Sequence, residues 1–180
     1  MNLKKIFVLI GILSLFGCEK DDVCDATTPT TPRLVISFFD YANQANPRNV
    51  TNLKINGHLM TSALVLTPTA TDDSKYLTNA NKIAIPLQTD ANLTQFEFVL
   101  NATTDLTKAT DDLKFNYSKT DIFVSRACGF KTIFDLSETN LPSFVINNDP
   151  TKNAGNWIKK IELVQPKINT ENETHIKIYF

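Results

Sequence analysis

The chain has two histidines, and these are the residues most able to support acid–base chemistry. Hydrolases with a serine or cysteine nucleophile use a histidine that a second polar group holds in place. His58 follows Gly57 at a predicted turn. His175 alternates with Lys177 and Tyr179 on what we predict to be the outward face of the last strand. Both patterns favour surface histidines over a catalytic base or a metal ligand.

Acidic residues occur as three adjacent pairs, Asp21-Asp22, Asp72-Asp73 and Asp111-Asp112. None has the alternating oxygen ligands of a calcium loop, so we interpret them as solvated turn residues and expect no metal and no cofactor. A glycosidase needs two carboxylates facing each other across a cleft, and nothing in the sequence marks such a pair. We therefore expect no catalytic residues and a protein that is not an enzyme, with a hydrolase as the less favoured alternative.

Cys18 follows a segment with the layout of a secretory signal peptide. Two lysines begin this segment, and an apolar run of about eleven residues (6–16) follows, too short to cross a hydrocarbon core of roughly 30 Å. We expect residues 1–17 to be removed, leaving no transmembrane segment. Leu15-Phe16-Gly17-Cys18 resembles a bacterial lipobox, which implies a lipid on the thiol of Cys18. An ordinary signal peptide is the alternative.

The four residues after Cys18 are charged: Glu19, Lys20, Asp21 and Asp22. They resemble the lysine-plus-acidic export signal of Bacteroidota lipoproteins. That resemblance implies a protein anchored by lipid to the outer membrane and displayed on the cell surface. The alternative is retention at the periplasmic face, with these charges acting only as a solvated tether.

Cys24 and Cys128 remain after lipidation, so only one disulfide is possible. In an oxidising compartment such a bond persists. It would close a loop of about 100 residues, for which chain entropy allows up to about 4.7 kcal/mol. Free thiols acting as metal ligands or as a nucleophile are the alternative. They are less favoured because neither cysteine lies in a Cys-x-x-Cys pair or beside a histidine.

Length and charge limit the function classes further. Residues 18–180 suffice for one domain with a real core. The first 17 residues hold two of the 18 basic residues and none of the 19 acidic ones, so the mature chain has a net charge of −3. Basic residues are scattered singly, which gives no electrostatic case for nucleic acid.

The hydrophobic pattern predicts a proline-bearing tether over residues 18–32 and an all-β domain over residues 33–180. About ten short runs of β-forming residues are separated by turn residues, and no long amphipathic helix is evident. The principal runs are Arg33–Phe39, Leu53–Asn56, Ala63–Leu66, Lys82–Leu87, Gln95–Leu100, Leu113–Ser118, Ile122–Ser125, Lys131–Phe134, Ser143–Ile146, Trp157–Val164 and Thr174–Phe180. We predict an antiparallel β-sandwich, immunoglobulin-like or similar, with a barrel as the alternative.

Three details of the sheet follow from single residues. Pro86 cannot donate to a neighbouring strand, so its strand should lie at an edge. The alternation on both sides of residues 118–121 predicts a hairpin with its turn there. The chain ends on a strand, which we expect to be paired within a sheet.

Aromatic side chains could serve as platforms for sugar rings. The candidates are Trp157, Tyr41, Tyr76, Tyr117 and Tyr179. Trp157 opens an alternating strand, so packing in the core is favoured for it. A glycan-binding protein of nutrient capture is therefore an alternative hypothesis, and it requires an exposed row of aromatics.

Several stretches together resemble a family of uncharacterised Bacteroidota (Flavobacteria-type) lipoproteins of unknown function. They are the residues 18–24, 31–36, 115–118, 125–130, 157–158 and 175–180. The resemblance implies location and domain extent, and it makes the pairing of Cys24 with Cys128 more plausible because both lie inside matching stretches. It implies no activity.

These observations favour a lipid-anchored cell-envelope protein that acts as a non-enzymatic binding or surface-assembly module. Its expected partners are the membrane, through the lipid anchor, and another envelope protein or a glycan. The sequence does not indicate an oligomeric state.

Overall fold

The computed structural model describes residues 23–25, 27–28, 30–58, 60–152 and 154–180. These residues form a β-sandwich without a closed barrel, so the predicted fold class is confirmed. The signal segment 1–17, Cys18 and the charged residues Glu19, Lys20, Asp21 and Asp22 lie outside the described residues. Their roles stay predictions.

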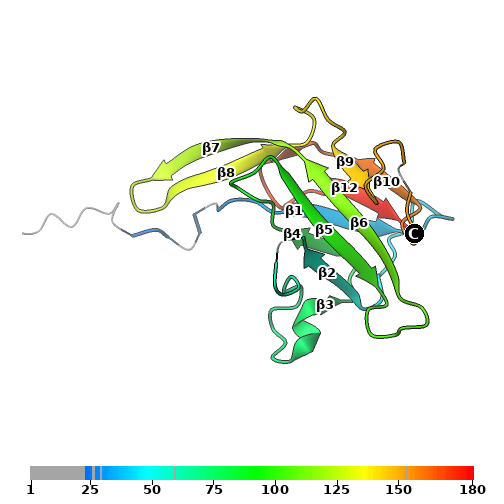
Figure 1. The fold of residues 1–180 in the computed structure, drawn as a ribbon. Helices are drawn as coiled ribbons and strands as arrows, with labels where there is room; N and C mark the ends of the chain where they lie inside the picture. The colour runs from blue at the N-terminus through cyan, green and yellow to red at the C-terminus, as the bar shows by residue number, and fades with distance from the viewer. Residues whose placement is uncertain (1–22, 26, 29, 59, 153) are drawn as a thin grey trace, which may run out of the picture.

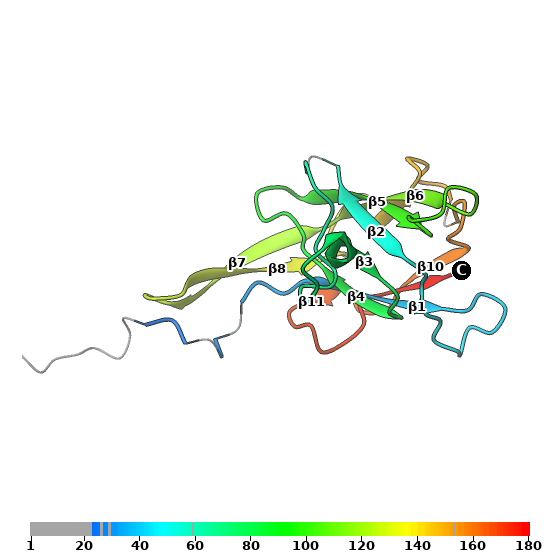
Figure 2. The same cartoon turned by 90° about the horizontal axis from the view of Figure 1, so that it is seen from below.

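Two larger sheets form the layers of the sandwich, as Figure 2 shows. One has five antiparallel strands in the order β3 (Leu77–Thr78), β2 (Leu53–Gly57), β5 (Leu93–Leu100), β6 (Ala109–Asn116) and β9 (Phe144–Ile146). The other has four in the order β10 (Lys160–Leu163), β12 (Ile176–Tyr179), β1 (Leu34–Phe39) and β4 (Lys82–Ile85). A 3-10 turn, Asp73–Tyr76, precedes β3.

A third sheet projects from one end of the sandwich (Figure 1). It consists of β11 (Lys167–Ile168), β8 (Gly129–Asp135) and β7 (Ser118–Ser125), in that order. β11 pairs only with the base of β8, at Phe134 and Asp135. The outer half of the β7–β8 hairpin therefore extends beyond the third strand.

The core lies between the two larger sheets and is built by alternation. In β1, Leu34, Ile36 and Phe38 are fully buried. From the five-stranded sheet, the fully buried residues Ile55, Phe98, Leu113 and Phe115 belong to the same core cluster. Such burial contributes roughly 1.5–3 kcal/mol for each large apolar side chain, which makes this face the main source of stability.

Most predicted strands are present, and their edges follow the predicted logic. β4 pairs only with β1 and is an edge strand, as Pro86 predicts. β12 lies between β10 and β1, antiparallel to the first and parallel to the second, so the last strand is paired inside a sheet. The predicted strand Ala63–Leu66 was wrong: only a single bridge, between Asn56 and Ala63, occurs there.

The predicted hairpin at residues 118–121 was also wrong. β6 and β7 belong to different sheets, and the chain passes from one to the other at Tyr117. The ring of Tyr117 is buried and meets Phe134 edge to face at 5.1 Å. The real hairpin joins β7 to β8, with its turn at residues 126–128. Alternation on both sides of Tyr117 has the same period, so it could not reveal a change of sheet.

Asp111 is a buried carboxylate, which corrects its interpretation as a solvated turn residue. β6 begins at Ala109, so Asp111 shares its inward face with Leu113 and Phe115. Its two oxygens accept four hydrogen bonds, from Asn147 Nδ2 (2.8 Å) and from the backbone N–H groups of Asn156 (2.6 Å), Trp157 (2.9 Å) and Ile158 (3.0 Å). A side chain at Gly155 would collide with this carboxylate. Asp111 thus holds the segment that leads into β10.

We expect Asp111→Asn to lower the free energy of unfolding by about 3 kcal/mol, because an amide group would face buried N–H donors in place of an acceptor. Urea unfolding measures the effect. The matched control is the neighbouring Asp112→Asn, which should change stability by less than about 0.5 kcal/mol since that side chain is only half-buried. Equal effects of the two substitutions would contradict the role of Asp111.

Candidate functional site

The disulfide joins the tether to the projecting hairpin. Cys24 and Cys128 are bonded, with their Cα atoms 5.0 Å apart, which supports the predicted pairing. Cys128 lies in the β7–β8 turn. The tether also contacts the outer edge of β8, where the backbone N–H of Thr132 donates to Thr31 Oγ1 at 3.0 Å. The tether is therefore fastened to the hairpin before the chain enters the sandwich at β1.

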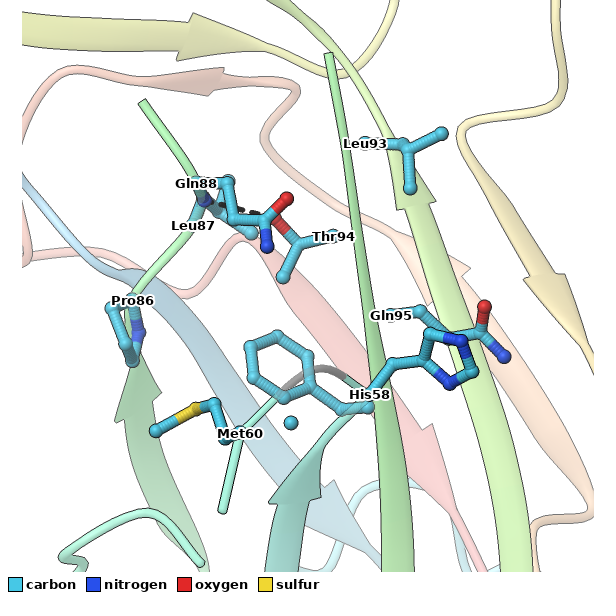
Figure 3. Close-up of a pocket in the computed structure, with 10 residues that line it drawn as sticks. His58, Met60, Pro86, Leu87, Gln88, Leu93, Thr94 and Gln95 are labelled. Carbon is cyan, nitrogen blue, oxygen red and sulfur yellow. Dashed lines mark hydrogen bonds between the residues drawn. The ribbon is translucent and has the colours of Figure 1, made fainter. Parts of the chain in front are cut away.

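An apolar groove of about 160 Å³ opens between the start of β5 and the segment after β4 (Figure 3). Leu87 and Phe96 form its buried floor. Met60 and Leu93 are about half exposed at its rim. The groove is smaller than a typical ligand pocket of roughly 300–1,000 Å³, so it suits a single apolar side chain better than a cofactor.

A closed ring of hydrogen bonds fixes one wall of this groove. The backbone N–H of Gln88 donates to Thr94 Oγ1 (2.9 Å), and the Tyr117 hydroxyl donates to the Gln88 carbonyl (2.8 Å). Thr94 Oγ1 and the Tyr117 hydroxyl lie 2.7 Å apart, so the Thr94 hydroxyl completes the ring as donor. Burial raises the pKa of Tyr117, which keeps this hydroxyl protonated at physiological pH. The wall is therefore rigid.

His58 lies at the rim of the groove, next to Gln95 in Figure 3. Its side chain is exposed, as predicted, and its backbone N–H donates to the Gln95 carbonyl at 3.0 Å. Within the described chain, no carboxylate hydrogen-bonds to the imidazole of either histidine. Among the described residues, the groove therefore holds no histidine that a carboxylate orients.

His175 is fully buried, so its prediction as a surface residue was wrong. Nδ1 accepts a hydrogen bond from the Val35 backbone N–H at 2.9 Å, and Nε2 has no hydrogen-bond partner among the described residues. The residue precedes β12, where His175 is buried although Lys177, on the same face, is only half-buried, so alternation alone could not assign His175 to the outside. Burial lowers the pKa of His175 and favours the neutral ring.

The aromatic candidates do not form an exposed row. Trp157, Tyr117 and Tyr179 are buried, with Trp157 in the core as predicted. Tyr41 follows β1 and is half exposed, whereas Tyr76 ends the 3-10 turn. Within the described residues, these five side chains therefore offer no extended platform for a glycan.

The exposed aromatic pair is instead Phe123 and Phe130, which sequence reasoning missed. They are direct partners across β7 and β8, and their rings meet edge to face at 5.4 Å. Both side chains are mostly exposed, at 58% and 68%. A turn at residues 126–128 was the feature of the sequence that could have revealed this pair. A hairpin with its turn there places the two phenylalanines opposite each other.

Over the described ranges, no three His, Cys, Asp or Glu side chains gather where they could hold an ion.

In the same ranges, no helix is long and apolar enough to cross a bilayer.

The fold and these features define a disulfide-tied β-sandwich protein with a projecting hairpin and a small apolar groove. The chain belongs to a family of unknown function, DUF6452, whose model matches residues 51–180. No curated protein and no solved structure matches the chain.

The buried histidine predicts a pH dependence of stability. Because the pKa of His175 is lower in the folded chain, the unfolded chain takes up a proton near pH 6.5 that the folded chain does not. Stability should therefore be full above about pH 6.5 and should fall as the pH drops below it. In His175→Asn, Oδ1 can replace Nδ1 as the acceptor for the Val35 backbone N–H, and the new side chain does not titrate. Urea midpoints at pH 7.5 and 5.5 should differ less in this variant than in the natural chain, and equal differences would contradict the prediction.

The disulfide predicts a mass change. Intact mass under denaturing conditions should rise by two hydrogens on reduction, and by none in Cys24→Ser. The loss of stability on reduction should remain below about 4.7 kcal/mol, because reduction also frees the exposed tether in the folded chain and this gain in entropy offsets part of the gain in the unfolded chain. An unchanged mass after reduction of the natural chain would disprove the bond.

Proposed function

We propose that this protein is a lipid-anchored component of a bacterial cell envelope and acts as a non-enzymatic binding or surface-assembly module. Cys18 carries the lipid, the outer membrane holds the anchor, and the domain is displayed on the cell surface. The resemblance to Bacteroidota lipoproteins at residues 18–24 supports this assignment, together with the signal-like segment before it. Two or three acyl chains anchor stably, whereas one does not.

The observation that carries the proposal is the bond between Cys24 and Cys128. A disulfide requires an oxidising compartment, which agrees with export. Six residues before Cys24 stands the proposed lipid-bearing cysteine. The bond fastens the chain to the folded domain almost immediately after the anchor, so the domain cannot move far from the membrane.

The groove supports binding rather than catalysis. Its floor is apolar and its wall is rigid, while the histidine at its rim has no carboxylate partner among the described residues. Its size suits an apolar side chain of another envelope protein better than a sugar ring. We propose that this other envelope protein contacts the groove.

Labelling tests the anchor. Cells expressing the natural chain should incorporate radioactive palmitate into this protein, and Cys18→Ala should abolish the incorporation. Cys24→Ala is the matched control, since it removes a nearby cysteine that carries no lipid in this proposal. Palmitate on Cys18→Ala, or none on the natural chain, would disprove the anchor.

Proteolysis of intact cells tests the leaflet. A protease added outside should degrade a surface-displayed protein and should spare a periplasmic one. Substituting Lys20, Asp21 and Asp22 by alanine should protect the protein while palmitate labelling continues, because only the export signal is lost. Protection of the natural chain would favour the periplasmic face.

A further inference from the structure

The β7–β8 hairpin carries apolar side chains that the protein itself does not cover. We define the hairpin tip as residues 122–131. Phe123 and Phe130 pack on each other and not on the core, and both are mostly exposed. Val23, beside the disulfide on the tether, is 79% exposed. Figures 1 and 2 both show the hairpin projecting from the sandwich with the tether alongside it. The tip is an apolar surface in need of a partner.

The charges of the tip have one sign. Residues 122–131 include Arg126 and Lys131 and no acidic residue. Arg126 lies in the turn and is exposed. Apolar rings flanked by basic side chains are the composition of segments that lie in a membrane interface, where the rings enter the acyl boundary and the cations reach the headgroups.

The chain length places this tip beside the anchor. Cys18 and Cys24 are separated by six peptide steps, which span at most about 20 Å when fully extended. Cys24 is bonded to Cys128 within the tip. The Cα atoms of Cys24 and Cys128 are 5.0 Å apart, so the lipid at Cys18 holds Cys128 within about 25 Å of the bilayer.

We propose that the hairpin tip is a membrane-contact element: Phe123 and Phe130 insert into the interface of the bilayer that holds the Cys18 lipid. This inference rests on the proposed lipid anchor. It adds an orientation, with the hairpin toward the membrane and the opposite end of the sandwich away from it. The disulfide makes this orientation possible, because it joins the chain next to the lipid anchor directly to the tip.

The test uses the full mature, lipidated chain in vesicles of phosphatidylethanolamine and phosphatidylglycerol, with a tryptophan reporter in place of Phe130. Phe130→Trp keeps an aromatic side chain at the tip. The control is Tyr41→Trp, in the loop after β1, which lies at the opposite end of the sandwich from the hairpin in both Figure 1 and Figure 2. The natural Trp157 is buried and contributes the same background to both.

Vesicle binding should shift the added emission of Phe130→Trp to shorter wavelength, and lipids brominated on their acyl chains should quench it. Neither should change the emission of Tyr41→Trp. Phe123→Trp, the cross-strand partner, is a second reporter and should also be quenched. Flotation of the vesicles tests the lipid anchor separately from the membrane contact of the tip. A chain that floats while its tip reporters stay unquenched overturns the membrane contact alone, whether the tip then faces water, a second copy or another protein. A chain that does not float contradicts the anchor and the membrane contact together.

Discussion

The carboxylate of Asp111 is the interaction on which the joining of the two layers depends. It belongs to β6 of the five-stranded sheet, yet its four donors lie on loops, three of them on the segment that leads into β10 of the other sheet. A buried charge needs hydrogen-bond donors, and a buried loop needs acceptors for its backbone N–H groups, so each satisfies the other. The same segment delivers Trp157 into the core, where its ring meets Phe38 and Phe180. One acidic residue thereby positions the tryptophan of the core.

The two ends of the molecule differ because the β7–β8 hairpin extends beyond the hydrophobic core. Toward one end, the strands of both layers are covered and the C-terminal residue is held by Arg48, whose guanidinium donates to the Phe180 carbonyl at 2.6 Å and lies over its ring. Toward the other end, β7 and β8 continue beyond β11, the third strand of their sheet. That end carries the disulfide, the tether and the exposed phenylalanines, so any attachment through the N-terminal segment acts there.

Prediction from the sequence worked where a single residue type imposes a local rule. Pro86 marked an edge strand because it has no N–H to donate, and the alternation of the last strand marked a paired strand. It failed for Asp111 and His175. Both are polar residues on strands or at their ends, and whether such a residue is solvated depends on which distant segment covers it. Residues 155–158 cover Asp111, and the backbone of Val35 meets His175.

The sequence by itself determined the all-β class and the edge position of β4, because residue period and a missing donor are local facts, and its three cysteines allow at most one disulfide within the chain. The tertiary structure decided that the chain changes sheet at Tyr117, that Asp111 is the buried link between layers, and that the groove carries no oriented base within the described residues. It also decided that Phe123 and Phe130 stand in solvent. The physical reason is that alternation tells which residues share a face of a strand, whereas only the packing of distant segments decides whether that face is covered.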